Sequence, residues 1–388
     1  MSTAAAHVPE EISVDRLKEL LDSDESFTLV DTRDEESFEE WRLAAATQFR
    51  YTPDHEFDAE AFIEATGVER DDPVITICAL GKSSTTLAYD LADAGFTDVR
   101  FVEGGMEAWS GVYDAVEIET PGAAEIVQLQ RRAKGCLGYV IADPEVGAAA
   151  VVDPTRYTDE FVTVAEERDW TIERVFDTHI HADHISGGRA LASELDVPYH
   201  LGEYTRDREV GYEFDALERN EVVSVGDVEI KAVYTPGHTS DMISYLVDGD
   251  AVLTGDTVFV DGIGRTELQF GDAEAEGGAE LLYDSLHGTL LALPDTVTVL
   301  PGHFHVSEHG EYNVDPGTPI ETTIGELRTG LDVLEYDRER FVEYILDNVP
   351  EKPPNYERVI EINRGVSEPE DEQEAIELEL GPNRCAAE

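Results

Sequence analysis

The chain has 388 residues, which is long enough for two ordinary domains with separate cores. Its 86 acidic residues against 27 basic ones give a formal net charge of −59, which excludes the basic surface that nucleic-acid binding requires. It has neither an apolar run of about 18 residues nor a basic segment leading into a shorter one, so it predicts no membrane span and no signal peptide.

The acidic residues are spread along the whole chain among apolar ones. So large a charge makes a compact fold repel itself, and about 1 M salt, where the Debye length is about 3 Å, screens most of that repulsion. We therefore expect a protein of a salt-rich cytoplasm, as in extreme halophiles; the alternative is an acidic surface that binds basic partners. The cysteines Cys78, Cys136 and Cys385 form no disulfide pattern and fit a reducing, cytoplasmic location.

A first domain is predicted over residues 10–118. Strands are expected at Thr28–Val30, Val74–Ile77 and Val99–Phe101, and a helix at Thr85–Ala94. Strands that alternate with helices indicate a parallel α/β sheet. The predicted boundary is the segment Glu119-Thr120-Pro121-Gly122, because Pro-Gly interrupts regular structure and the pattern then changes.

Cys78 stands where a predicted strand ends and the next helix begins. The residues Gly81, Lys82, Ser83 and Ser84 follow it and complete the loop. Backbone N–H groups at a helix N-terminus bind anions, and a cysteine in such a place has a lowered pKa. The loop therefore predicts a nucleophilic thiolate with an anion cradle, to which Lys82 adds positive charge. The alternative is a buried cysteine at the end of an ordinary strand.

The first domain resembles the rhodanese family in three segments. They are Val30-Asp31-Thr32-Arg33, the C-x-x-G-x-S-S loop that begins at Cys78, and the residues from Val102 to Trp109. The resemblance implies sulfur transfer, with a persulfide on Cys78 held by the loop amides. The family's usual His-Ile-Pro-Gly-Ala turn is replaced by Arg42-Leu43-Ala44-Ala45-Ala46. Both a sulfurtransferase and a docking module that no longer turns over fit this sequence.

A second pattern of elements covers residues 123–364. Strands are predicted at Ala148–Val152, Val222–Val225, Val228–Tyr234, Ile243–Val247, Ala251–Leu253 and Val297–Leu300, and helices at Asp159–Arg168 and Gly188–Glu194. A helical stretch is expected at Ile320–Asn348. Residues 365–388 are predicted to form an acidic tail, solvated or loosely packed because Ser367–Glu379 is dense in glutamate.

The second domain carries a cluster of potential metal ligands. The heptapeptide Thr178–His184 contributes His179, His181, Asp183 and His184, and further along lie His238, Asp256 and His303, each after an apolar run. Such a cluster is costly to bury unless a cation sits among its members. Nitrogen and oxygen ligands suit zinc, iron or manganese, so the sequence predicts a metal enzyme.

The ligand motifs H-x-H-x-D-H, T-P-G-H-T, T-G-D and P-G-H resemble those of the metallo-β-lactamase superfamily, in its glyoxalase II and persulfide dioxygenase branch. The resemblance covers about residues 123–364 and implies an αββα sandwich with the metal at the loop edge between two sheets. The expected fold class is therefore α/β and α+β in two domains: a rhodanese-like parallel-sheet domain, then the sandwich with a C-terminal helical extension.

Two activities within that branch share these ligands. In glyoxalase II-like thioesterases all seven residues bind two metals. In persulfide dioxygenases the resemblance implies one Fe(II) on His179, His238 and Asp256, with open positions for sulfur and O2. The remaining four, His181, Asp183, His184 and His303, would then orient the ligands or, in the other activity, hold a second metal. The identity of the ligands does not decide between the two.

Three features favour the dioxygenase. Gly264-Arg265-Thr266-Glu267-Leu268-Gln269 resembles the G-R-T-D-F-Q segment of persulfide dioxygenases, Ile185-Ser186-Gly187-Gly188 follows the histidines as it does there, and a sulfur-transfer domain has no clear use beside a thioesterase. Arg265 is a candidate for binding a substrate carboxylate, and a structural salt bridge is its alternative.

Other residues near these motifs receive no catalytic role. The segment Phe304–His309 departs from the dioxygenase pattern, which leaves the form of the substrate pocket open, and His305 and His309 are interpreted as loop residues. Cys136 is interpreted as a packing thiol.

The predicted function is oxidation of a low-molecular-weight thiol persulfide with O2 to sulfite and thiol at one Fe(II) per chain, coupled to sulfur transfer through Cys78. The alternatives are a hydroxyacyl-thiol hydrolase with two zinc or mixed metals and a persulfide sensor without turnover. Expected partners are the persulfide, O2 and thiosulfate or sulfite, with no nucleic acid or membrane. The thiol carrier, the direction of sulfur flow and whether the chain is a homo-oligomer are left open.

Overall fold

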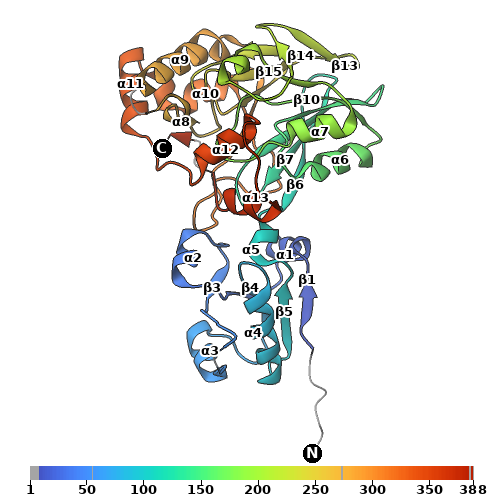
Figure 1. The fold of residues 1–388 in the computed structure, drawn as a ribbon, viewed down its shortest axis with the longest axis vertical. Helices are drawn as coiled ribbons and strands as arrows, with labels where there is room; N and C mark the ends of the chain where they lie inside the picture. Colours follow the sequence, from blue (N-terminus) through green and yellow to red (C-terminus); the bar gives the residue numbers. More distant parts are fainter. Residues whose placement is uncertain (1–7, 55, 272–273, 384–385, 388) are drawn as a thin grey trace, which may run out of the picture.

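The computed structural model describes residues 8–54, 56–271, 274–383 and 386–387. Two bodies follow one another along the chain: a smaller N-terminal domain and a larger one that also contains the C-terminus (Figure 1). Cys385 lies outside the described residues. Within them, no helix combines the length and apolar character that a membrane span needs.

The N-terminal domain is built on one parallel sheet of five strands. In spatial order they are β1 (Glu10–Ile12), β5 (Asp98–Val102), β4 (Pro73–Ile77), β2 (Thr28–Asp31) and β3 (Ala46–Gln48). The helices are α1 (Val14–Leu21), α2 (Glu35–Glu40), α3 (Ala59–Thr66), α4 (Lys82–Asp93) and α5 (Gly105–Trp109). Successive side chains of a strand point to opposite faces of the sheet, so alternate residues of β4 pack in two separate cores. Ile75 lies in one core and Val74 in the other. The predicted parallel α/β domain is confirmed.

The larger domain contains two sheets packed face to face. The first has the order β12 (Asp215–Leu217), β11 (Tyr199–Gly202), β10 (Thr171–Phe176), β9 (Ala148–Val152), β8 (Leu137–Asp143), β7 (Glu125–Arg131) and β6 (Tyr113–Ile118). The second has the order β13 (Val222–Val225), β14 (Val228–Tyr234), β15 (Ile243–Val247), β16 (Ala251–Gly255), β18 (Thr298–Pro301) and β19 (Thr322–Thr323).

Helices cover the outer faces of both sheets. Those on the first sheet are α6 (Thr158–Glu167) and α7 (Gly188–Leu195), and those on the second are α9 (Ala275–Gly288), α10 (Ile324–Gly330) and α11 (Arg338–Asp347). Ile141 and Tyr245 meet in the central core, whereas their neighbours Val140 and Leu246 face the helical layers. The expected αββα sandwich is confirmed. The remaining short elements are η1 (Glu203–Arg208), β17 (Ile263–Gly264), α8 (Glu267–Phe270), η2 (Leu290–Ala292), η3 (Asp332–Glu335), α12 (Tyr356–Asn363), α13 (Glu372–Leu378) and β20 (Ala386–Ala387).

The change of domain comes before β6, earlier than predicted. This strand pairs antiparallel with β7 along its whole length, from Tyr113 opposite Arg131 to Ile118 opposite Ile126. Residues 113–118 therefore belong to the sandwich, although the prediction placed them in the first domain. Pro121 and Gly122 lie between β6 and β7 and close a β-hairpin, so they are not a linker. The sequence could not distinguish the two, because proline and glycine are common in both turns and linkers.

The described part of the acidic C-terminal tail packs against the sandwich, in contrast to the expectation of a solvated or loosely packed segment. Ala375 on α13 packs with Ile185 and Ile362, and Glu379 is buried. Further along, β20 pairs antiparallel with β17. In Figure 1 the red C-terminal segment lies against the sandwich just above the N-terminal domain. The predicted helical stretch at 320–348 is broken into α10, η3 and α11.

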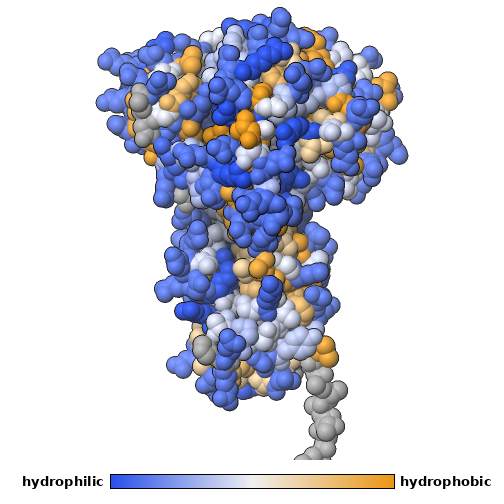
Figure 2. All heavy atoms as spheres, viewed as in Figure 1, coloured by the Kyte–Doolittle hydropathy of each residue, from blue (hydrophilic) through white to orange (hydrophobic). Residues whose placement is uncertain are grey.

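The two domains contact each other at two segments, residues 42–46 and 304–309, whose sequences differ from the usual pattern of their families. The backbone N–H of Arg42 donates to the carbonyl of Glu308 at 3.1 Å, so the altered turn of the first domain meets the altered loop of the second. Buried Arg132 of the sandwich also pairs with Asp22, the residue that follows α1, and with Asp114 on β6 of its own domain. The surface shown in Figure 2 is mainly hydrophilic over both domains, in keeping with the charge of the chain.

Candidate metal centre

All seven predicted ligands meet at one edge of the sandwich. The H-x-H-x-D-H residues lie in the loop after β10, and His238, Asp256 and His303 follow β14, β16 and β18. Each of the seven side chains is buried, with a relative exposure of 3% or less. The close approach of the strand ends requires Gly302, because a Cβ there would lie 2.6 Å from an oxygen of Asp256.

His179, His238 and Asp256 form one compact group within the cluster. The Oδ2 atom of Asp256 lies 3.5 Å from Nε2 of His238 and 3.9 Å from Nε2 of His179. The Oδ2 of Asp256 and the Nε2 of His179 are buried without a hydrogen-bond partner among the described residues. Ligands bound at about 2.1 Å to one ion lie roughly 3.0–3.4 Å apart, so a small inward movement fits these three to a metal.

Contacts behind this group fix its ring orientations. The Nδ1–H of His238 donates to the carbonyl of Arg265 at 2.7 Å, and Nδ1 of His179 lies 3.0 Å from the hydroxyl of Thr178. The other oxygen of Asp256 faces Nδ1 of His303 at 2.6 Å. Such partners select the tautomer that points Nε2 at a metal.

The same burial sets the charges of the group. Burial lowers the pKa of His238 and lowers that of His179 well below its ordinary value, so both rings are neutral at pH 7, as metal ligands must be. Burial alone would raise the pKa of Asp256, but the adjacent His303 ring holds it below its ordinary range. The group thus presents two neutral imidazoles and one carboxylate.

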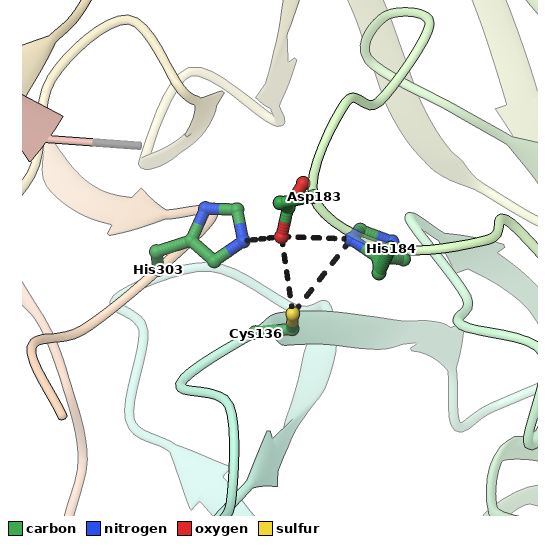
Figure 3. A group of neighbouring side chains, drawn as sticks. All are labelled: Cys136, Asp183, His184 and His303. Carbon is green, nitrogen blue, oxygen red and sulfur yellow. Dashed lines mark hydrogen bonds and ion pairs between the residues drawn. The ribbon is translucent and has the colours of Figure 1, made fainter. Parts of the chain in front are cut away.

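Asp183, His184 and His303 form a second group, and Cys136 joins it (Figure 3). One oxygen of Asp183 lies 2.8 Å from Nε2 of His303, 3.2 Å from Nδ1 of His184 and 3.4 Å from the sulfur of Cys136. His303 therefore lies between two carboxylates, with one nitrogen toward Asp256 and the other toward Asp183. Cys136, interpreted from the sequence as a packing thiol, thus lies beside the predicted ligands; burial opposes its ionisation, but the neighbouring His184 lowers the Cys136 pKa to about 7.

His181 forms a third group with two further carboxylates. Its Nε2 lies 3.3 Å from Asp153, and Asp177 completes the set. Asp153 also accepts hydrogen bonds from the backbone and the hydroxyl of Thr178, at 2.7 and 2.9 Å. The seven predicted ligands are thus brought together but divided into three sets.

Arg265 does not point its guanidinium at open space. The side chain is 1% exposed and pairs with Glu267, and it also donates to the carbonyls of Pro350 and Glu351 at 2.9 and 3.0 Å. The proposed role in binding a substrate carboxylate is therefore not supported, because the alternative, a structural salt bridge, occupies the same atoms. What Arg265 contributes to the centre is its backbone carbonyl.

Two C-terminal residues that the sequence did not single out hold the motif loop in place. The amide of Asn363 donates to the carbonyls of His181 and His184 at 2.9 and 2.7 Å. Glu379 accepts a hydrogen bond from the backbone N–H of Ile185 at 2.5 Å and pairs with Arg131 and Arg156. No local pattern marks these residues, because their partners are distant in the sequence.

The Cys78 loop has the predicted form. The thiol is 4% exposed and lies 3.3 Å from the hydroxyl of Ser84, just before α4 begins. Burial opposes ionisation, but hydrogen bonds from Ser83, Ser84 and loop amides lower the Cys78 pKa below its ordinary value of 9.0. Gly81, with a φ of 77°, is the N-cap of α4, which begins at Lys82. The structure therefore places Cys78 beside hydroxyl and amide donors at the start of α4, and its reactivity stays a prediction.

A cavity of about 250 Å³ opens between this loop and the C-terminal segment. Ala79, which follows the cysteine, lines it together with Arg33 and Trp41 from the first domain. Leu380 and Pro382 line it from the other side. The C-terminal segment therefore adjoins both the metal-binding loop, through Glu379, and the approach to the cysteine loop.

Comparison with known proteins agrees with this architecture. Residues 13–111 match the family model of the rhodanese-like domain, and residues 131–303 match that of the metallo-beta-lactamase superfamily. The cytoplasmic hydroxyacylglutathione hydrolase of Arabidopsis thaliana is 32% identical over 232 residues, which cover 58% of this chain and 81% of the relative.

Solved structures show the same relationship. ETHE1 from Myxococcus xanthus is 31% identical, with a TM-score of 0.54 over 62% of this chain and 98% of its own. A metallo-beta-lactamase from Staphylococcus aureus subsp. aureus COL is 25% identical, with a TM-score of 0.56 over 63% of this chain and 73% of its own.

Proposed function

Because this chain belongs to the metallo-β-lactamase superfamily and carries a rhodanese-like domain before it, we propose that it oxidises a low-molecular-weight thiol persulfide with O2. The reaction consumes one persulfide, one O2 and one water, and yields sulfite and the free thiol. The proposed site is the group of His179, His238 and Asp256, with one Fe(II) per chain.

The observation that carries this proposal is the position of His303. Its two nitrogens are held between Asp256 and Asp183, at 2.6 and 2.8 Å, so it acts as a hydrogen-bonding bridge behind the ligand group. In a dinuclear site the same Nε2 would be a ligand of a second metal, so the two candidates differ in what this atom binds. A face of two histidines and one carboxylate is the arrangement of non-haem iron enzymes, where Fe(II) supplies open positions for a sulfur ligand and for O2.

The residues of the chain itself bind, orient and exclude water. Neutral His179 and His238 present Nε2, while Thr178 and the Arg265 carbonyl hold the opposite side of each ring. Asn363 keeps the motif loop closed over the group, which is buried from solvent. Burial of this kind limits unwanted hydrolysis of a reactive substrate.

In the same proposal, the rhodanese-like domain moves sulfane sulfur through Cys78. Its thiolate, stabilised by Ser83 and Ser84, accepts the outer sulfur atom of a persulfide or of thiosulfate, and a thiol or sulfite leaves. The domain can therefore supply the persulfide or consume the sulfite. The ion pair of Arg132 with Asp22 joins the two domains, and Asp114 holds the same arginine from within the sandwich.

A thioesterase is the second candidate. The Arabidopsis relative bears the name hydroxyacylglutathione hydrolase, and the ligand residues of this chain are compatible with two metals. In that case Asp183, His184 and His303 would hold the second ion, and the metals would activate water for attack on a thioester carbonyl.

Oxygen uptake separates the two candidates. Full-length protein loaded with iron, in about 1 M KCl, is given a small-thiol persulfide while O2 and sulfite are followed. We expect one O2 consumed for each sulfite formed, and no uptake by Asp256→Ala. If several persulfides give no uptake while a hydroxyacyl thioester is hydrolysed by the zinc-loaded protein, the dioxygenase assignment is wrong and the thioesterase replaces it.

A further inference from the structure

The C-terminal part of the chain lies beside the Cys78 loop (Figure 1). On α13, the amide of Gln373 donates to the carboxylate of Glu107 on α5 at 2.9 Å. The backbone N–H of Glu107 in turn donates to the carbonyl of Ala79, the residue after Cys78, at 3.1 Å. A helix of the larger domain is therefore connected to the cysteine loop of the smaller one through a single residue of α5.

The residues after α13 lie against the first domain. Leu380 packs against the hydrophobic core that contains Trp41, and a Cβ on Gly381 would lie 3.9 Å from the Cβ of Trp41. Buried Lys134 holds this stretch from the sandwich, because its Nζ donates to the carbonyls of Glu379 and Gly381 at 3.2 and 3.4 Å. The segment is thus a fixed wall contributed by the second domain.

The cavity of about 250 Å³ lies between this wall and the Cys78 loop. Ala79 lines it from the loop, and Arg33 lines it from the adjoining strand end. The residue before Arg33 is Thr32, whose hydroxyl lies 2.8 Å from that of Ser83 in the same loop. A water molecule in the liquid takes up about 30 Å³, so the cavity has roughly eight water volumes, enough for a small thiol.

The cation that lines this cavity is already compensated. Among the described lining residues Arg33 is the only cation, and its Nη2 lies 2.6 Å from the carboxylate of buried Asp31. Its Nη1 donates to the carbonyl of Ser37 at 3.0 Å, and Nη2 also donates to that of Trp41 at 2.6 Å. The guanidinium therefore offers little attraction to an anion in the cavity.

Two carboxylates of the lining have no such compensation. Glu40 and Glu377 are exposed, and among the described residues neither pairs with a cation. Glu377 accepts a hydrogen bond from the neutral amide of Gln373 at 3.1 Å. These charges attract a cation and repel a dianion such as thiosulfate. Trp41 and Leu380 add apolar surface for a short carbon chain.

We propose that this cavity admits the sulfur donor of Cys78, and that the donor is the persulfide of a small amine-bearing thiol. Its ammonium group is placed toward Glu40 and Glu377, whereas thiosulfate and the persulfides of acidic thiols are disfavoured. The inference rests on the proposed role of Cys78 in sulfur transfer. It goes beyond that role because it assigns the class of donor and makes residues of the second domain determinants of its choice.

The transfer itself needs no further reactant. The Cys78 thiolate attacks the outer sulfur of the donor R–S–SH, the S–S bond of the donor breaks, and a new S–S bond forms on Cys78. The donor leaves as R–S⁻, and the proton stays on the transferred sulfur. Cys78 is oxidised to the persulfide as the donor is reduced to the thiol, so the step is balanced.

The test compares two donors of equal chain length and opposite charge, the persulfides of cysteamine and of 3-mercaptopropionate, with thiosulfate as a third. Full-length protein is mixed with each donor without oxygen, so that the proposed oxidation cannot consume it. Peptide mass spectrometry follows the gain of a sulfur atom on Cys78. KCl is kept at the lowest concentration at which circular dichroism shows a folded chain, because salt screens the charges. We expect cysteamine persulfide to load Cys78 about fivefold faster or more, and thiosulfate to be the slowest.

Variants connect this preference to the cavity. Glu377→Gln removes a lining charge that the second domain contributes, and it should lower the preference about twofold or more. As a control, Glu36→Gln changes an exposed residue of α2 outside the cavity and should keep the wild-type preference. Leu380→Trp fills the space and should slow loading from both persulfides, whereas Leu281→Trp, at an exposed position on α9, should not. Circular dichroism shows whether each variant is folded.

The possible failures are distinguishable. Equal loading by the two persulfides, faster loading by thiosulfate, or an unchanged preference in folded Glu377→Gln would overturn the assignment of the donor. Undiminished loading in folded Leu380→Trp would overturn the cavity as the route to Cys78. If no donor loads Cys78, the proposed sulfur transfer is itself wrong, and this inference fails with it. None of these results depends on which metal the second domain binds.

Discussion

The backbone carbonyl of Arg265 accepts a hydrogen bond from Nδ1–H of His238 at 2.7 Å. The side chain of the same arginine is anchored by Glu267 and by two carbonyls of the segment before α12. One residue therefore connects the ligand histidine to a distant part of the chain. The ion pair does not touch the metal-binding atoms, but it holds the carbonyl that orients one of them.

Replacing Glu267 with glutamine should weaken metal binding. The change removes the charge that anchors Arg265, so the carbonyl behind His238 becomes less well fixed, and losses of about 10-fold or more in metal affinity are typical for such partners. The measurement is the dissociation constant for Fe(II) from competition with a chelator. As a control, Glu280→Gln breaks an exposed pair with Arg338 and should leave the constant unchanged. An unchanged constant in Glu267→Gln would show that the carbonyl needs no anchor.

Two alanine variants distinguish one iron from two metals. On the proposed function, His179→Ala removes a ligand of the catalytic iron, whereas His184→Ala removes a residue of the Cys136 group. After loading with Fe(II) alone, His179→Ala should contain far less than one iron per chain, and His184→Ala should contain about as much as the wild type. Iron content by elemental analysis decides this. If the wild type binds two irons per chain and His184→Ala binds only one, the site is not mononuclear.

The reactivity of Cys78 should depend on Ser84. Hydrogen bonds to the thiolate hold its pKa below 9.0, so the rate of alkylation by iodoacetamide should rise with pH to a midpoint below that value. Ser84→Ala removes one donor, 3.3 Å from the sulfur, and should move the midpoint to higher pH. Peptide mass spectrometry follows Cys78 alone. Thr86→Val, on the same helix but bonded only to the carbonyl of Lys82, should leave the midpoint in place.

The ligands of the metal centre could be predicted from the sequence because each sits in a short motif at the end of an apolar run. The division of those ligands could not, since it depends on side-chain directions across four loops. The position of Cys136 beside these ligands could not be predicted for a related reason: it arises from pairing with His303, a residue far along the chain. No residue next to Cys136 in the sequence indicates that contact.

The outcomes at Arg265, where the salt bridge given as the alternative is formed, and in the tail share a physical origin. A sequence shows that a side chain is charged, but not whether its partner lies in solvent, in a substrate or in a distant segment. Arg265 finds Glu267, and Glu379 finds two arginines in the sandwich. A glutamate-rich segment is predicted to be solvated. A single buried glutamate such as Glu379 can nevertheless hold the segment against the sandwich.

Salt should stabilise the fold, if the charge has the effect predicted from the composition. With 86 acidic and 27 basic residues, repulsion is strong at low ionic strength and largely screened at about 1 M, where the Debye length is about 3 Å. The melting temperature should rise with KCl and then level off. Because screening depends on ionic strength alone, tetramethylammonium chloride should act alike. A melting temperature independent of salt would contradict the expectation of a salt-adapted protein.

Glu379 should contribute strongly to stability, because its carboxylate is buried between Arg131 and Arg156 and holds the N–H of Ile185. Glu379→Gln leaves two guanidinium groups without their buried partner, and such changes cost about 3–5 kcal/mol. The measurement is the free energy of unfolding by urea in about 1 M KCl. Glu372→Gln removes an exposed partner of the same Arg156 and should cost less than about 1 kcal/mol.

The difference in unfolding free energy between the wild type and Glu379→Gln should depend on pH. Burial opposes the charged form, but the two arginines hold the pKa of Glu379 below its ordinary value of 4.5. A carboxylate whose pKa is lower in the folded protein stabilises it fully above 4.5, and that contribution is lost as pH falls through the folded pKa. The gap in unfolding free energy between wild type and Glu379→Gln should therefore be constant from pH 7 down to about 5 and close only below 4.5. A gap that already closes near neutral pH would mean that the tail is held by something other than this ion pair.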